Sequence, residues 1–116
     1  MNELKEDLII VLKEYVGESQ ESIHKMIEVL LKNLPKNCQE LLNAIKNENW
    51  KEVRFYAHKT KYSFRILHMK EEMNLLEEME KTAEEIADLY EIKKVYKQIE
   101  QKSKVICQAL EEISKN

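Results

Sequence analysis

The stretch AHKTKYSF, residues 57–64, places one histidine among basic side chains in a chain that is acidic overall. A free imidazole titrates near neutral pH, so a large fraction is uncharged there and one ring nitrogen can act as a nucleophile. Attack of that nitrogen on phosphorus would hold a phosphoryl group covalently, and a nearby lysine could stabilise the added negative charge. His58 and Lys61 are therefore the candidate pair for phosphoryl chemistry.

The direction in which His58 points depends on its helix, which the pattern predicts from Trp50 to about Met69. At ~100° per residue, the bulky side chains of this helix fall opposite His58, so they should meet the core while His58 faces solvent. These side chains are Val53, Tyr56, Thr60, Phe64 and Leu67. This spacing disfavours the interpretation that His58 only packs in the core. The alternative that His58 is a surface histidine without a function remains open.

Basic side chains surround His58 on the same wheel, and Lys61 is expected to face solvent with them. Four of them lie within ~60° of it: Lys51, Arg54, Lys61 and Arg65. Like charges at this spacing destabilise a helix slightly, so the arrangement favours a bound anion. Phe55, Tyr62 and Ile66 lie on one flank, either as an apolar docking strip or packed against the edge of another helix.

The helix that carries His58 needs neighbours to bury its apolar side. The chain has 116 residues, which suits a single domain over 1–116, and its one glycine and one proline leave too few turn residues for a sheet. Apolar spacing predicts a short helix to Val16, a rod over 20–47 containing Pro35, the helix from Trp50, one from Lys70 to 85–88, and a last helix after Asp88. Ser19, Asn49 and Asp88 are the expected N-caps. We therefore predict an all-α fold, an antiparallel up-and-down four-helix bundle with a short additional N-terminal helix.

Net charge and composition limit the classes of partner and the compartment that we expect for this protein. The formal net charge is −3, which argues against a general nucleic-acid binder. Charged residues interrupt the apolar N-terminal stretch, so neither a signal peptide nor a membrane span is expected and the protein should be cytoplasmic. Cys38 and Cys107 show no metal or redox spacing and are expected to be free thiols. One apolar face per helix closes a core without a second copy, so a monomer is expected.

The chain offers no glycine-rich phosphate loop and no Mg²⁺-binding cluster. It therefore cannot be expected to take a phosphoryl group from ATP by itself and is predicted to be a phosphocarrier rather than an enzyme with its own ATP site. A partner must supply the nucleotide site or the acyl phosphate, and the metal.

At this point the residues resemble a known family. AHKTKYSF, residues 57–64, is similar to the A-H-x-L-K-G-S motif of histidine-containing phosphotransfer (HPt) domains, some of which read K-P-S-F. ENWKEVRFYAHKTK is similar to the D-W-x-x-L-x-x-x-A-H-x-L-K approach of that family, MIEVLLKNLPKNCQELLNAI to its preceding helix, and MNLLEEMEKTA to its following helix. The resemblance covers about residues 10–113.

The resemblance implies a four-helix bundle whose histidine carries phosphate between aspartates of response-regulator receiver domains, in a phosphorelay with a hybrid sensor kinase. His58 matches the phosphoacceptor, Lys61 the assisting lysine and Ser63 the small residue that follows. Arg54, Phe55, Tyr62, Arg65 and Ile66 are the predicted docking residues for the partner. No cofactor is expected on this chain, because Mg²⁺ belongs to the receiver.

The sequence departs from the family at two glycines. Tyr62 follows the lysine where the family has glycine, and Leu67-His68 replaces a later L-G pair. Tyr62 could narrow the approach to His58 or serve in docking, so an interaction module that binds an acidic receiver-like surface without transfer is the alternative. Glu21 and His24 have the E-x-x-H spacing of di-iron bundles, but no second pair follows. Neither the kinase, the regulator nor the direction of phosphate flow can be read from the sequence.

Overall fold

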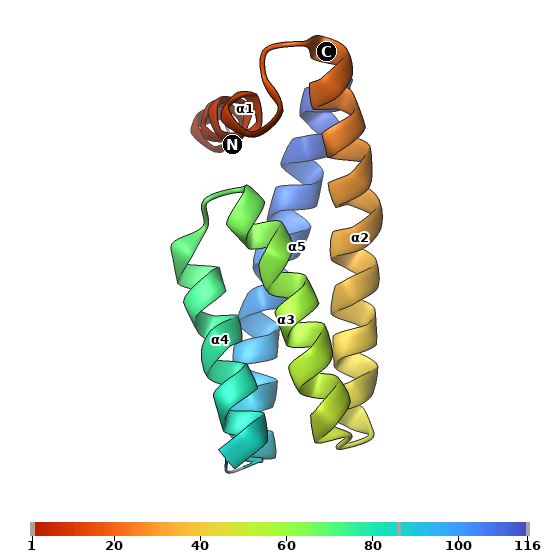
Figure 1. Cartoon of the computed structure of the whole chain (residues 1–116), viewed down its shortest axis with the longest axis vertical. Coiled ribbons are helices and arrows are strands. Elements are labelled where there is room, and N and C mark those ends of the chain that lie inside the picture. The colour runs from red at the N-terminus through yellow and green to blue at the C-terminus, as the bar shows by residue number, and fades with distance from the viewer. Residues whose placement is uncertain (1, 86, 116) are drawn as a thin grey trace.

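The computed structural model describes residues 2–85 and 87–115, which form five α-helices and no strand (Figure 1). The helices are α1 (Asn2–Val16), α2 (Gln20–Lys46), α3 (Trp50–Ile66), α4 (Lys70–Glu85) and α5 (Leu89–Ser114). The all-α class is confirmed, with each helix close to its predicted range. The predicted end of the fourth helix and the predicted domain 1–116 include residues 1, 86 and 116, which lie outside the described residues.

The predicted N-caps are confirmed. The side chains of Ser19, Asn49 and Asp88 accept hydrogen bonds from the backbone N–H three residues later, at 3.3, 3.2 and 3.2 Å. Each cap satisfies one of the N–H groups that the first turn of a helix leaves without an internal partner. The starts of α2, α3 and α5 are therefore encoded locally in the sequence.

The helix α3 ends at Ile66, earlier than the predicted Met69, because His68 adopts a left-handed conformation with φ 56°. The N–H of His68 donates to the Arg65 carbonyl at 3.1 Å and that of Met69 to the Phe64 carbonyl at 2.9 Å. This pair of bonds is the Schellman motif, in which glycine usually takes the left-handed position. His68 therefore occupies a left-handed position at which the end of a helix usually has glycine.

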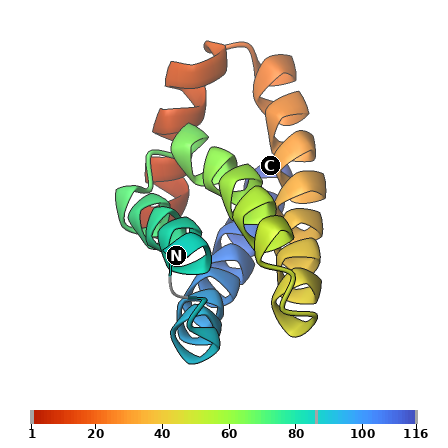
Figure 2. The same cartoon turned by 60° about the horizontal axis from the view of Figure 1, so that its bottom comes forward.

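Four of the helices lie alongside one another and α1 crosses one end of them (Figure 1). Among the described residues, α3 packs against α2 and α4, and α5 packs against the same two helices, whereas the backbones of the diagonal pairs α2–α4 and α3–α5 do not approach each other closely. Figure 2 shows α3 between α2 and α4. The helix that carries His58 is therefore flanked by α2 on one side and α4 on the other.

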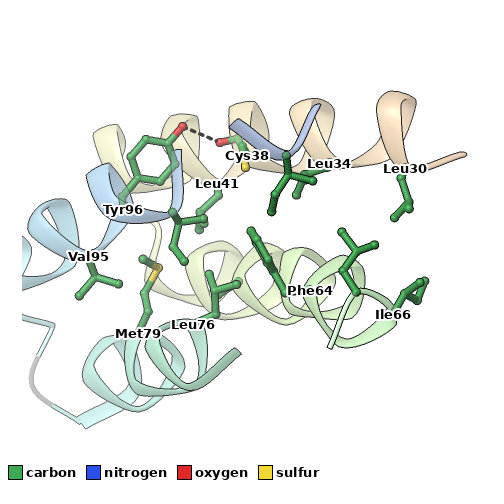
Figure 3. Close-up of a cluster of buried hydrophobic side chains, with 14 of the residues drawn as sticks. Leu30, Leu34, Cys38, Leu41, Phe64, Ile66, Leu76, Met79, Val95 and Tyr96 are labelled. Carbon is green, nitrogen blue, oxygen red and sulfur yellow. Dashed lines mark hydrogen bonds between the residues drawn. The ribbon is translucent and has the colours of Figure 1, made fainter. Parts of the chain in front are cut away.

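The core lies inside this ring and extends beneath α1 through Leu8 and Leu12. Figure 3 shows Phe64 of α3 among side chains of α2, α4 and α5, including Leu34 and Leu76. The Tyr96 hydroxyl donates to the Cys38 carbonyl at 3.1 Å and ties α5 to α2. Pro35 lies inside α2 and is exposed, as a residue without an N–H can be on the outer side of a helix. None of the described helices is long and apolar enough to cross a membrane.

We expect the fold to lose stability at alkaline pH because burial raises the pKa of the Cys38 thiol from 9.0 to about 11. The unfolded thiol ionises first, so the contribution of Cys38 is complete below pH 9.0 and is lost as pH rises to about 11. The loss amounts to about 2–3 kcal/mol. Urea unfolding at about pH 8 and about pH 10.5 measures how much the free energy of unfolding falls between the two pH values. We expect this fall to be smaller in Cys38→Ala than in wild type. Cys107→Ala is the control. The Cys107 thiol is less buried than that of Cys38, so this variant should keep most of the pH-dependent fall in the free energy of unfolding. An equal fall in wild type and Cys38→Ala would contradict the prediction.

Candidate functional site

The α3 helix presents His58 to solvent, as its spacing predicts. The His58 side chain is 68 % exposed, whereas Val53, Ala57 and Phe64 on the opposite side are fully buried. Thr60, an unusual polar residue on the core side, donates its hydroxyl to the Tyr56 carbonyl at 2.7 Å, which satisfies it within the helix. The predicted orientation of His58 is confirmed.

Lys61 does not face solvent, so this part of the prediction was wrong. Its side chain is only 11 % exposed, and its ammonium nitrogen Nζ lies 2.9 Å from Glu80 Oε2. The helical wheel places Lys61 on the outer side of α3, but α4 packs against that flank and covers the lysine stem. A long side chain of this kind buries its methylene groups and keeps its charge only by pairing.

Glu80 of α4 joins the two candidate residues, and the sequence analysis missed it. While its Oε2 binds Lys61, its Oε1 lies 3.4 Å from Nδ1 of His58. The Glu80 side chain is itself only 23 % exposed. The one feature of the sequence that could have indicated Glu80 is its position directly after Met79, a buried residue of the apolar stripe of α4. Other acidic residues of α4 have similar spacing, so this feature does not single out Glu80.

The other cations near His58 are balanced in part by the protein itself. Arg54 is half-buried and lies 3.8 Å from Glu84 of α4, so two of the four cations pair with carboxylates of that helix. Lys51 and Arg65 are exposed. The four-cation stripe is therefore a weaker indication of a bound anion than the sequence suggested.

The predicted docking residues divide into an exposed set and a buried one. Phe55 and Tyr62 are each 56 % exposed and flank His58 one turn before and one turn after it. Lys59 lies over the Phe55 ring, with Nζ 5.4 Å from the ring centre. Ile66, in contrast, is only 7 % exposed and belongs to the core (Figure 3), so its prediction as a docking residue is corrected.

A hollow of about 250 Å³ opens beside His58 on the α2 flank. Its lining residues are Asn33 and Asn37 of α2 and His58, Lys59, Tyr62 and Ser63 of α3. Tyr62 forms part of the wall of this hollow. His58 is thus bordered by a carboxylate on the α4 side and by amide and hydroxyl groups on the α2 side.

Glu21 and His24, the pair with the spacing of a metal site, have other contacts in the structure. Glu21 lies 3.3 Å from Lys25, and His24 lines a separate cavity beneath α1. Within residues 2–85 and 87–115, no three His, Cys, Asp or Glu side chains come together in a way that could hold a metal ion. The E-x-x-H spacing is therefore not part of a larger ligand set in the described part of the chain.

Removing the shared carboxylate should loosen the packing of α3 on α4. Glu80→Ala leaves the Lys61 ammonium without its partner in a largely covered position, so we expect a loss of about 1–3 kcal/mol in the free energy of unfolding. Glu84→Ala is the matched control: Glu84 is 66 % exposed and binds Arg54 at 3.8 Å, and its loss should stay within about 0.5 kcal/mol. Urea unfolding measures both, and equal effects would show that the Lys61–Glu80 bond does not hold the two helices.

Comparison with known proteins adds no family to this description. No protein-family model matches the chain, and neither a curated protein nor a solved structure matches it. The function is therefore argued from the geometry around His58 and from the short motif that contains it.

Proposed function

We propose that this protein is a histidine phosphocarrier in which His58 receives a phosphoryl group from the aspartyl phosphate of a receiver domain and passes it on to another. The observation that carries the proposal is the exposed imidazole whose Nδ1 lies 3.4 Å from Glu80, the carboxylate that also binds Lys61. The position of His58 within AHKTKYSF, a stretch that resembles the HPt motif, also supports the proposal.

The arrangement of helices supports the same proposal. We propose that α2 to α5 are an up-and-down antiparallel four-helix bundle of the HPt kind, with α1 as an additional N-terminal helix. Support comes from the ring of contacts in which α3 meets α2 and α4, together with the short connections between successive helices. In such a bundle the acceptor helix has one side in the core and the opposite side free for a partner.

Glu80 prepares one ring nitrogen of His58 for attack. A carboxylate 3.4 Å from Nδ1 favours the tautomer that has its proton on Nδ1, so the lone pair resides on Nε2. Nε2 attacks phosphorus as the acyl P–O bond breaks, and the electron pair of that bond leaves with the aspartate carboxylate of the receiver. A new N–P bond forms, the Nδ1 proton stays between His58 and Glu80, and onward transfer runs the same steps in reverse.

In this proposal Lys61 stabilises the phosphoryl group once it is attached to His58. An ammonium has three N–H donors, and one of them is engaged by Glu80 at 2.9 Å. The remaining donors are available to a phosphoryl oxygen on the neighbouring imidazole, as a charge-assisted hydrogen bond. Mg²⁺ and the acyl phosphate belong to the receiver in this scheme, so the present chain supplies only the acceptor and part of the charge stabilisation.

Incubation of the protein with a phosphorylated receiver domain tests the proposal. We expect the label to move to this chain and to be released by acid but not by alkali, which is the stability of phosphohistidine. Phosphoramidate, a small phosphoryl donor, should label the same chain without a receiver. Binding of a receiver without label from either donor would contradict the proposal and favour an interaction module that docks through Phe55 and Tyr62.

A further inference from the structure

The hollow on the α2 flank of His58 contains a polar side chain that the proposed chemistry leaves unused. Asn37 is only 9 % exposed and lines this hollow together with His58. No hydrogen bond to its side-chain amide is found within residues 2–85 and 87–115. Asn43, two turns further along α2, differs because its amide oxygen accepts a hydrogen bond from Gln39 at 3.1 Å.

Helix geometry places Asn37 opposite His58. The helices α2 and α3 are joined by a tight turn after Lys46 and before Trp50. Asn37 precedes Lys46 by nine residues and His58 follows Trp50 by eight. At ~1.5 Å per residue both lie ~12–14 Å from the turn along their helices. The two side chains therefore line the hollow at the same height.

Among the described residues, Glu112 Oε2 is the one fully buried side-chain polar atom without a partner, so the Asn37 amide keeps contact with solvent in the hollow. Because the rest of the Asn37 side chain is covered, its amide is held in place with its hydrogen-bonding capacity free. The Asn37 amide opens onto the hollow, so a ligand there could satisfy it. Nδ1 of His58 lies 3.4 Å from Glu80 of α4, while the same side chain lines the hollow on the α2 side.

We propose that Asn37 donates its amide N–H to a phosphoryl oxygen carried on Nε2 of His58. This inference rests on the proposed function and adds a binding residue from α2 to it. Lys61 then approaches the phosphoryl group from the α4 side and Asn37 from the α2 side. The neutral amide donates a hydrogen bond without adding a charge that would repel the neighbouring lysines.

The test is the end-point equilibrium of phosphoryl transfer between the intact protein and a phosphorylated receiver domain that labels it. At low protein concentration this equilibrium depends only on the free and phosphorylated forms of each protein, so a residue that merely docks the receiver changes the rate and not the end-point. Asn37→Leu keeps the number and branching of the side-chain heavy atoms but removes the donor. We expect the equilibrium to shift about tenfold toward the receiver, the value of one hydrogen bond to a charged group. Asn37→Asp should shift it further, because a carboxylate repels the phosphoryl dianion.

Asn43→Leu is the matched control, since it removes an amide from the same helix outside the hollow, and its end-point should equal that of wild type. Circular dichroism checks that each variant folds. Wild-type labelling with unchanged end-points in both Asn37 variants would overturn the role of Asn37 and leave the proposed function standing. Slower transfer with an unchanged end-point would assign Asn37 to docking and also overturn the inference. Absence of label on the wild-type chain would overturn both proposals.

Discussion

His58→Gln is expected to abolish labelling by both a phosphorylated receiver and phosphoramidate. Glutamine offers an amide nitrogen whose lone pair is delocalised, so no nucleophile remains at this position. The fold should be unaffected because the His58 side chain is 68 % exposed. Transfer is measured as acid-labile phosphate on the chain after exposure to each donor, and it should fall to the background level.

The other two histidines provide the controls for this variant. His24→Gln and His68→Gln should each label like wild type, since His24 lies in a cavity beneath α1 and His68 closes α3. Label that survives in His58→Gln and disappears in either control would move the acceptor to another site. An unfolded His58→Gln protein would contradict the exposed position of the ring.

The second large effect concerns the core below the site. Phe64 is fully buried, in contact with the clustered side chains of α2, α4 and α5 (Figure 3). Phe64→Ala deletes the ring and leaves a cavity that the surrounding helices fill only partly. We expect the free energy of unfolding to fall by about 3–5 kcal/mol, measured by urea unfolding.

Phe55→Ala is the matched control in the same helix. Phe55 is 56 % exposed, so its truncation should change the free energy of unfolding by about 0.5 kcal/mol or less. The same variant tests docking, because loss of an exposed ring at an interface should weaken binding of the receiver. Similar losses of stability in the two variants would show that α3 is oriented differently from the arrangement described above.

The helices and their starts were predictable because their signals are local. Ser19, Asn49 and Asp88 each cap the helix that follows, and this bond involves a residue only three positions away. The outward direction of His58 also follows from one helix alone, since its periodicity fixes which side chains lie opposite it. The end of α3 was placed too late because the left-handed conformation of a histidine, His68, has no strong sequence signal.

The surroundings of His58 could not be predicted because they depend on neighbouring helices. A wheel of α3 cannot show that α4 covers Lys61, nor that Ile66 turns into the core. Glu80 is distant in sequence from His58, and only the packing of α3 on α4 brings them together. Asn37 likewise becomes relevant only once the α2–α3 turn sets the two helices at matching heights. In each case the missing information was tertiary contact, not local preference.

The most direct measurement is nitrogen and phosphorus NMR of the ¹⁵N-labelled protein after reaction with phosphoramidate. The proposed mechanism predicts scalar coupling between the phosphorus and Nε2 of His58, with the proton retained on Nδ1 beside Glu80. Coupling to Nδ1, coupling to His24 or His68, or no phosphorus–nitrogen coupling at all would contradict it.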